Sequence, residues 1–320
     1  MKKIYIYAPS GAVRDKAAFR RGVRRLQLLG HTVEIDPDAL SSHQRFAGDD
    51  AARLAAIHRA AASGADVALI ARGGYGLTRI LKDIDYHALA QAVARGMQWV
   101  GISDFTALQL ALLAKTGCIS WAGPALCEGF GVGSNPQDSN TPALPDDIME
   151  DCFGDMLAGR SEGTGWRLPR TTEGSTPSLH IRDAILWGGN LTIVTTLLAT
   201  PYFPPITDGI LFLEDVGEHP YRIERMLTQL LYAGVLDQQK AILLGQFTEF
   251  KLTTHDKGFK LKTVFDWLKQ QTRTPILTNL PYGHVATKVL LPVGARTDLV
   301  VQDRDALLLW GHLAWQHAIQ

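Results

Sequence analysis

Ser103 stands between an apolar segment and a helix-forming segment, a position from which a serine can act as a nucleophile. Residues 99–113 (WVGISDFTALQLALL) predict a strand that ends just before Ser103 and a helix that begins just after it. A sharp strand-to-helix turn exposes a serine Oγ at the carboxyl edge of a sheet, and the following helix points N–H groups at the same place. The GxSxG pattern is incomplete because Phe105 replaces its second glycine. A helix cap formed by Ser103 or Asp104 is therefore an equally good interpretation of this segment alone.

A second candidate site is the glycine-rich segment ARGGYG at 71–76, which follows the apolar strand ADVALIA. Paired glycines let the backbone approach a ligand closely and offer N–H donors, so the N–H of Gly74 can contribute to an oxyanion hole. A nucleotide-phosphate loop is a weaker interpretation, because the spacing of a dinucleotide or P-loop motif is absent. A tight turn between strand and helix is the purely structural alternative.

Two further segments supply an acid and a base. Glu214 ends an apolar run, where a carboxylate can accept a hydrogen bond from a histidine Nδ1–H, and Glu218 is a rival four residues later. An ion pair between Glu214 and an arginine such as Arg222 is the structural alternative. His284 follows a Pro-Tyr-Gly turn and is predicted to lie on a loop, where an imidazole can serve as a general base. It is one of ten histidines, so its position alone carries little weight.

Apolar strands and helices alternate through the first part of the chain and would position these residues. The sequence predicts strands at 3–7, 31–35, 65–71 and 98–102, and helices at 15–29, 49–63, 85–95 and 105–115. This alternation predicts βαβ units and a mostly parallel sheet, with Ser103 and the glycine-rich segment each at the end of a strand.

The pattern changes after about Glu128. Residues 129–145 are rich in Gly, Pro, Asn and Ser, which is typical of a connection between domains. A second series of elements follows, with strands at 184–187, 209–214, 240–247, 276–280, 299–302 and 306–310, and helices at 220–233 and 262–270. We therefore predict an N-terminal α/β domain at 1–135, a linker region at 136–178 and a C-terminal domain at 179–320.

Composition excludes several classes of protein. The 320 residues are 46% hydrophobic and 20% charged, as in ordinary globular proteins. Lys plus Arg and Asp plus Glu both count 32, so no basic excess indicates a nucleic-acid partner. The three cysteines lack CxxC spacing, which indicates reduced thiols rather than disulfides or a zinc site. No segment reaches the roughly 20 apolar residues that span a bilayer, and the N-terminus lacks the apolar stretch of a signal peptide. The sequence therefore predicts a cytoplasmic protein without a membrane partner.

Taken together, these segments resemble the LD-carboxypeptidase family of serine peptidases, also called muramoyltetrapeptide carboxypeptidases. The resemblance covers nearly the whole chain and rests on an ordered set of short motifs. These are APSG at 8–11, RGGYG at 72–76, GISDFTAL at 101–108, WGGNLT at 187–192, LFLEDVGEHPYRIERML at 211–227, YGH at 282–284 and LPVG at 291–294. No single motif is decisive, whereas the ordered set is specific.

The resemblance implies a fold, a set of site residues and a substrate class. The implied fold is α/β, with a mostly parallel flavodoxin-like N-terminal domain, a smaller C-terminal β/α domain and the active site in the cleft between them. The implied triad has Ser103 as nucleophile, His284 as base and Glu214 as orienting acid, with the N–H groups of Gly74 and Asp104 as oxyanion hole. The implied substrate is murein tetrapeptide, which loses its terminal D-alanine in peptidoglycan recycling without a metal or an organic cofactor. Family members often form homodimers.

Several alternatives stay open at this point. A carboxypeptidase must bind a free terminal carboxylate, and both Arg72 and Arg79 are near the glycine-rich segment. Some family members cleave acylated aminoacyl nucleotides of the microcin C type with the same triad and act as self-immunity proteins. A non-catalytic sugar- or nucleotide-binding protein is the alternative from a different class, and it has no need of a base and an orienting acid near Ser103.

Overall fold

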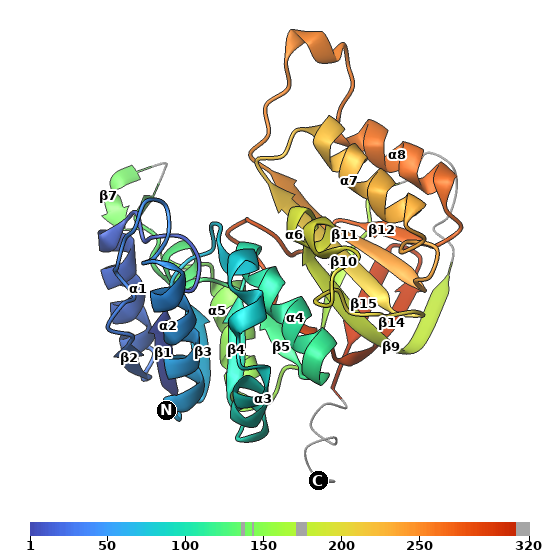
Figure 1. The fold of residues 1–320 in the computed structure, drawn as a ribbon. Helices are drawn as coiled ribbons and strands as arrows, with labels where there is room; N and C mark the ends of the chain where they lie inside the picture. Colours follow the sequence, from blue (N-terminus) through green and yellow to red (C-terminus); the bar gives the residue numbers. More distant parts are fainter. Residues whose placement is uncertain (136–137, 143, 171–177, 312–320) are drawn as a thin grey trace. The chain divides into compact units, whose positions relative to one another are not determined.

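The computed structural model describes residues 1–135, 138–142, 144–170 and 178–311, which form two compact units (Figure 1). Unit 1 comprises Met1–Leu157, Ala199–Pro204 and Ala286–Leu291, and unit 2 comprises Ala158–Leu198, Pro205–Val285 and the residues from Pro292 onward. Of the predicted linker region 136–178, residues 136–137, 143 and 171–177 lie outside the described residues.

Strands β1 to β5 of unit 1 belong to a sheet in the order β13-β5-β4-β3-β1-β2. Its strands are β1 (Lys3–Tyr7), β2 (Thr32–Ile35), β3 (Val67–Ile70), β4 (Gln98–Gly101), β5 (Ser120–Ala122) and β13 (Leu291–Val293). Strands β1 to β5 are parallel and follow the order 2-1-3-4-5, which is that of flavodoxin-like folds. All four residues of β3 are buried, as expected for a strand covered on both faces. The predicted fold class is thereby confirmed for this unit.

Most helices of unit 1 connect these strands, and three of them begin next to an aspartate that caps them. The helices are α1 (Lys16–Leu28), α2 (Asp50–Ala62), α3 (Tyr86–Ala94), α4 (Thr106–Thr116) and α5 (Asp147–Ala158). The side chains of Asp15, Asp49 and Asp85 accept hydrogen bonds from N–H groups in the first turns of α1, α2 and α3. Helices α2, α3 and α4 pack side by side (Figure 1). The short strands β6 (Ser134–Asn135) and β7 (Asp138–Pro142) form a separate antiparallel pair.

Unit 2 contains a seven-stranded mixed sheet in the order β12-β11-β10-β9-β14-β15-β8. The strands are β8 (Gly163–Arg167), β9 (Leu179–Asn190), β10 (Ile210–Val216), β11 (Ala241–Thr248), β12 (Ile276–Thr278), β14 (Arg296–Gln302) and β15 (Asp305–Leu309). Strands β9 to β12 are parallel, whereas β14, β15 and β8 continue the sheet in antiparallel fashion.

The parallel half of this sheet carries the helices of unit 2. They are α6 (Leu191–Leu197), α7 (Pro220–Tyr232) and α8 (Leu261–Gln271). Helix α7 packs between α6 and α8 (Figure 1). In β9 and β10, Asn190 lies opposite Glu214, so the carboxyl ends of both strands present a polar side chain at the same edge.

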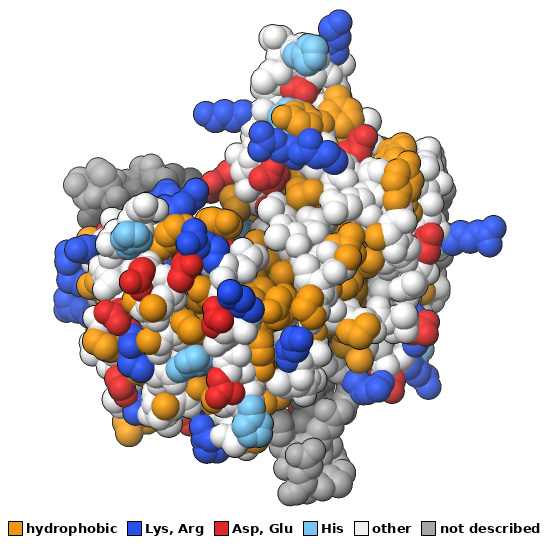
Figure 2. Space-filling model, viewed as in Figure 1, with side chains coloured by type: hydrophobic (Ala, Val, Ile, Leu, Met, Phe, Trp, Pro, Cys, Tyr) orange, Lys and Arg blue, Asp and Glu red, His pale blue; other side chains and the backbone are white. Residues whose placement is uncertain are grey.

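The surface carries charges of both signs. On the face shown in Figure 2, Lys and Arg side chains are interspersed with Asp and Glu. This agrees with the equal numbers of basic and acidic residues in the sequence. Within the described ranges, none of the helices has the length and apolar character that crossing a membrane requires.

Gly188 is a position in β9 that requires glycine. Its φ is 130°, and a Cβ built on it would lie 2.0 Å from the carbonyl oxygen of Phe212 in β10. We expect Gly188→Ala to lower the free energy of unfolding by about 2–5 kcal/mol, because backbone strain adds to a steric clash. The urea midpoint, followed by circular dichroism, measures this loss.

Gly154 in α5 is the matched control. A Cβ there would meet no atom within 4 Å, and the residue is helical. Gly154→Ala should therefore leave the midpoint unchanged or raise the stability by up to about 1 kcal/mol. Equal midpoints for the two variants would show that the close contact between β9 and β10 does not constrain residue 188.

Candidate active site

Ser103 occupies a strained turn at the carboxyl end of β4. It begins the 3-10 turn η3 (Ser103–Phe105), and α4 follows directly. Its φ of 69° lies in the left-handed region, which costs a residue with a Cβ on the order of 1–3 kcal/mol. A strained serine between a strand and a helix is the geometry that presents an Oγ for nucleophilic attack.

The backbone of Gly73 lies directly against the Ser103 side chain. A Cβ built on Gly73 would be 2.6 Å from Ser103 Cβ and 2.9 Å from Ser103 Oγ. Any side chain larger than hydrogen would therefore displace the serine. The glycine-rich segment and the serine turn, which follow the neighbouring strands β3 and β4, meet at this contact.

Neither Ser103 nor Asp104 caps helix α4. The residue that precedes α4 is Phe105, and no side chain forms a capping hydrogen bond at that helix start within the described structure. The Asp104 carboxylate instead accepts hydrogen bonds from Ser10 Oγ at 2.6 Å and from the Leu77 N–H at 2.9 Å. The capping interpretation of this segment is therefore wrong.

The peptide between Gly73 and Gly74 has a fixed orientation. Its carbonyl oxygen accepts a hydrogen bond from the Gly11 N–H at 3.1 Å. Because C=O and N–H point in opposite directions across a trans peptide, the Gly74 N–H is directed away from Gly11. In the part of the chain that the structure describes, this N–H donates no hydrogen bond to protein. Such a donor can serve a bound oxyanion.

Unit 2 contains a hydrogen-bonded pair of acid and base. The distance from His284 Nδ1 to Glu214 Oε2 is 2.7 Å. The Glu214 side chain is fully buried at the end of β10, whereas 21% of the His284 side chain is exposed. A carboxylate at Nδ1 holds the imidazole in the tautomer whose Nε2 is basic.

The second oxygen of Glu214 is held by a network that the sequence reasoning missed. Asn190 Nδ2 donates to Glu214 Oε1 at 3.2 Å and to Asp215 Oδ1 at 3.0 Å. The N–H and Oγ1 of Thr192 donate to Asp215 Oδ2 at 2.9 and 2.8 Å. Burial raises the pKa of Asp215, and the neighbouring charge of Glu214 raises it further. The WGGNLT motif contains both Asn190 and Thr192, so it is the signal in the sequence that could have pointed to this network.

The rival acid has a different partner. Glu218 Oε2 lies 3.5 Å from Arg222 Nη1 on the first turn of α7. Arg222 thus pairs with Glu218 rather than with Glu214, and the structural alternative for Glu214 does not occur.

The two arginines near the glycine-rich segment differ in their partners. Arg79 donates to both carboxylate oxygens of Asp50 and lies over the ring of Phe46. Arg72 donates to the carbonyl oxygen of Ala12 at 3.2 Å, and its Nε lies 3.6 Å from Glu128. Arg72 therefore keeps more of its donors for another ligand.

The structure thus brings the predicted site residues together in two groups. Gly74, Ser103 and Asp104 lie in unit 1, and Glu214 and His284 lie in unit 2. Their assembly into one triad stays a prediction. Among the described residues, no cluster of three or more His, Cys, Asp or Glu side chains could hold a metal ion.

A strained serine turn beside a glycine-rich loop, together with a glutamate–histidine pair, contains the parts of a serine hydrolase. Comparison with known families gives the particular class. Residues 4–123 match the LD-carboxypeptidase N-terminal domain, and residues 183–299 match the LD-carboxypeptidase C-terminal domain. The chain belongs to the LD-carboxypeptidase family and is a serine carboxypeptidase. The predicted resemblance is confirmed.

Individual relatives cover most of the chain. The murein tetrapeptide carboxypeptidase of Pseudomonas aeruginosa is 28% identical over 301 residues, which are 91% of each protein. The crystal structure of muramoyltetrapeptide carboxypeptidase from Oxalobacter formigenes superposes with a TM-score of 0.81 at 36% identity, covering 96% of this chain and 97% of that one. The microcin C7 self-immunity protein MccF of Escherichia coli is 26% identical over 258 residues, which are 73% of this chain and 70% of that protein.

The hydrogen bond between Glu214 and His284 predicts the tautomer of the histidine. In the neutral imidazole, we expect the proton of His284 on Nδ1, because Glu214 accepts a hydrogen bond there. Nitrogen-15 NMR of histidine-labelled protein distinguishes the two ring nitrogens. Glu214→Gln should weaken this preference because it removes the charged acceptor.

Glu218→Gln is the matched control, since Glu218 bonds Arg222 and not the imidazole. It should leave the spectrum of His284 unchanged. A proton on Nε2 in the native protein would contradict the proposed orientation of the base.

Proposed function

We propose that this enzyme is an LD-carboxypeptidase that releases the terminal D-alanine of murein tetrapeptide through an acyl-enzyme on Ser103. The observation that carries the proposal is the 2.7 Å hydrogen bond between His284 Nδ1 and the buried Glu214, which prepares a general base. The names of the relatives from Pseudomonas aeruginosa and Oxalobacter formigenes support the substrate class.

In the proposed reaction, the oxygen Oγ of Ser103 attacks the carbonyl carbon of the L-configured residue that precedes the terminal D-alanine. His284 Nε2 takes the proton of Oγ as this bond forms. The N–H groups of Gly74 and Asp104 donate to the oxyanion of the tetrahedral intermediate. Loss of one such donor typically lowers turnover by about 10²–10³-fold. Glu214 stays ionised and stabilises the imidazolium that forms.

The intermediate then expels D-alanine, whose amine receives its proton from His284 Nε2. Water attacks the acyl-enzyme with His284 again as base, and Ser103 Oγ recovers its proton. Each step uses groups of the protein and the substrate, so the proposed reaction requires no metal and no organic cofactor.

The terminal carboxylate of the substrate needs a cationic or N–H partner, and Arg72 fits this role better than Arg79. Arg79 is already bound by both oxygens of Asp50. The Nη1 atom of Arg72 lies 3.2 Å from the position that a Cβ of Gly74 would occupy. The guanidinium therefore lies beside Gly74, and we propose that it binds the terminal carboxylate of the substrate.

The setting that we propose for this activity is peptidoglycan recycling in the cytoplasm, by a homodimer. Murein peptides released from the wall would be the substrates there. The equal numbers of acidic and basic residues are consistent with a small peptide substrate rather than a nucleic-acid partner.

A second candidate is the cleavage of an acylated aminoacyl nucleotide of the microcin C type. The 26% identity to the self-immunity protein MccF favours it, because the proposed triad would serve both reactions. The two candidates differ in the group that leaves. Measuring the released product with each substrate therefore distinguishes them. Family membership excludes the alternative of a non-catalytic binding protein.

Ser103→Ala tests the proposed nucleophile. We expect D-alanine release from purified murein tetrapeptide to fall by roughly 10⁴–10⁶-fold, because no acyl-enzyme can form. The native enzyme should keep its rate in the presence of a chelator. Full activity of Ser103→Ala would refute the triad, whereas a native enzyme that releases no D-alanine would refute the substrate and leave the nucleotide peptide as the next substrate.

Arg72→Met tests the recognition of the terminal carboxylate. A charged hydrogen bond contributes about 1.5–3 kcal/mol, so kcat/KM for the free acid should fall by roughly 10–150-fold. The same peptide with a terminal amide should be cleaved by Arg72→Met and by the native enzyme at rates within about threefold of each other.

Arg79→Met is the control, because the Arg79 guanidinium is paired with Asp50. It should preserve the preference for the free acid. A loss of equal size for acid and amide in Arg72→Met would assign Arg72 a structural role instead.

A further inference from the structure

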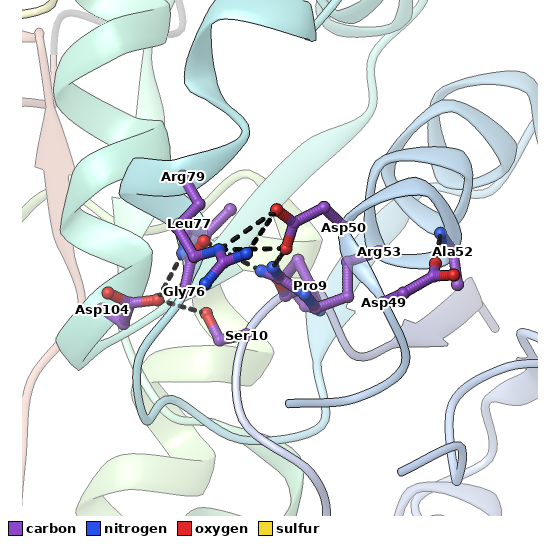
Figure 3. A network of polar contacts seen from close by, with 10 residues as sticks. All are labelled: Pro9, Ser10, Asp49, Asp50, Ala52, Arg53, Gly76, Leu77, Arg79 and Asp104. Carbon is purple, nitrogen blue, oxygen red and sulfur yellow. Dashed lines mark hydrogen bonds and ion pairs between the residues drawn. The ribbon is translucent and has the colours of Figure 1, made fainter. Parts of the chain in front are cut away.

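The loop Gly73–Leu77, here named the oxyanion loop, is held by three other segments of unit 1. These are the turn after β1, helix α2 and the serine turn after β4, and Figure 3 shows the contacts around the end of the loop. The proposed reaction uses two backbone N–H groups, from Gly74 and Asp104. It assigns no role to the Asp104 side chain, nor to the APSG motif after β1.

The Asp104 carboxylate connects the serine turn to the far end of this loop. The side chain is 1% exposed, and its Oδ2 accepts from Ser10 Oγ at 2.6 Å and from the Leu77 N–H at 2.9 Å. In Figure 3 the carboxylate points toward Leu77 and Ser10 at once. Within the described residues its Oδ1 has no hydrogen-bond partner, so both contacts depend on a single oxygen.

Arg53 of α2 holds the same end of the loop by binding a carbonyl oxygen of the loop. Its side chain is fully buried, and Nη1 donates to the carbonyl oxygens of Gly76 at 2.8 Å and of Pro9 at 3.2 Å. Nη2 bonds Asp50, which also binds Arg79 (Figure 3). The peptide between Gly76 and Leu77 is thus bound on its C=O side by Arg53 and on its N–H side by Asp104.

The other end of the loop is bound by the APSG motif. The Gly11 N–H donates to the Gly73 carbonyl oxygen at 3.1 Å, which directs the Gly74 N–H away from Gly11. A Cβ on Gly11 would lie 2.6 Å from Arg72 Nη1 and 3.1 Å from the same carbonyl oxygen, so a larger residue here would displace the Arg72 guanidinium.

Such anchoring matters because the glycines of the loop do not fix its backbone conformation by themselves. Gly74 and Gly76 have φ values of 113° and 137°, and glycine populates many other conformations as readily. Oxyanion stabilisation requires donors held to within about 0.5 Å of the productive geometry. A displaced Gly74 N–H would be lost to the transition state while ground-state binding changed little.

We propose that the Asp104 side chain is a positioning residue for the oxyanion loop, with Ser10 and Arg53 as its partners. One residue then supplies an oxyanion donor with its N–H and orients the segment that carries the other donor with its carboxylate. This inference rests on the proposed function, because the donors matter only if an oxyanion forms at Ser103.

Asp104→Ala removes both hydrogen bonds of the carboxylate and tests the proposal. We expect kcat for D-alanine release to fall by about 10²-fold while KM stays within about threefold, as for the loss of a transition-state donor. Hydrogen exchange of the amides in 73–77 should become faster. Asp104→Asn keeps an oxygen acceptor in the place of Oδ2, so it should recover at least about tenfold of the lost kcat.

Asp36→Ala is the matched control for a buried aspartate. Asp36 is also 1% exposed and accepts hydrogen bonds from Tyr5 and Arg59, but it follows β2 and does not touch the oxyanion loop. Its removal should lower stability without changing kcat or the exchange of 73–77.

Ser10→Ala and Ser120→Ala form a milder pair that avoids the loss of a buried charge. Both serines are 1% exposed, and each hydroxyl contacts a buried side chain, Asp104 and Gln109 respectively. Ser10→Ala should lower kcat by about three- to tenfold, in proportion to one hydrogen bond, and Ser120→Ala should not. This pair decides the question even if Asp104→Ala does not fold.

The proposal is overturned if Asp104→Ala and Asp36→Ala, or the two serine variants, have equal effects on kcat and on exchange in 73–77. A native enzyme that releases no D-alanine contradicts the proposed function instead. In that case exchange in 73–77 still shows whether the Asp104 carboxylate anchors the loop.

Discussion

Glu214 is a fully buried carboxylate, and the polar part of unit 2 is arranged around the need to give both of its oxygens a donor. An unpaired buried carboxylate costs several kcal/mol or becomes protonated, and a protonated acid could not stabilise an imidazolium. His284 donates to one oxygen and Asn190 to the other. The pairing of β9 with β10 brings Asn190 opposite Glu214, so sheet register and site chemistry depend on each other.

In unit 1, backbone groups position Ser103 and the glycine-rich loop. Strands β3 and β4 are neighbours, so the segments that follow them meet at one edge of the sheet. Gly73 permits contact with the Ser103 side chain, and the Asp104 carboxylate reaches back to the Leu77 N–H. The adjacency of two parallel strands therefore determines where Ser103 and the loop lie, and side-chain hydrogen bonds determine their fine geometry.

The local parts of this arrangement could be predicted from the sequence. The strand predicted at 3–7 is β1, and the helix predicted at 49–63 is α2 with one residue fewer at each end. The first is a continuous apolar run and the second begins at a capping aspartate. Both signals lie within a few residues of the element that they predict. The strand predicted at 184–187 is the 12-residue β9, whose first half is partly exposed and pairs with β14. Antiparallel pairing with a strand more than 100 residues away leaves no local signal.

The site shows the same division between local and distant information. An apolar run ends at Glu214, but Glu218 stands only four residues later, and only the path of the chain around His284 distinguishes the two acids. Arg72 and Arg79 look alike in sequence because Asp50, the partner of Arg79, lies 29 residues away. The Asp104 side chain resembled a helix cap since its true partners, Ser10 and Leu77, belong to other segments.

The left-handed backbone of Ser103 also bears on how such a chain can change over evolutionary time. A glycine at this position would adopt φ of 69° without strain, so replacing the proposed nucleophile would relieve strain in the fold. A serine at position 103 therefore costs stability, and only selection for turnover would keep it there. Where that selection lapses, the accessible descendant is a better-folded protein with the same loops and no reactive hydroxyl.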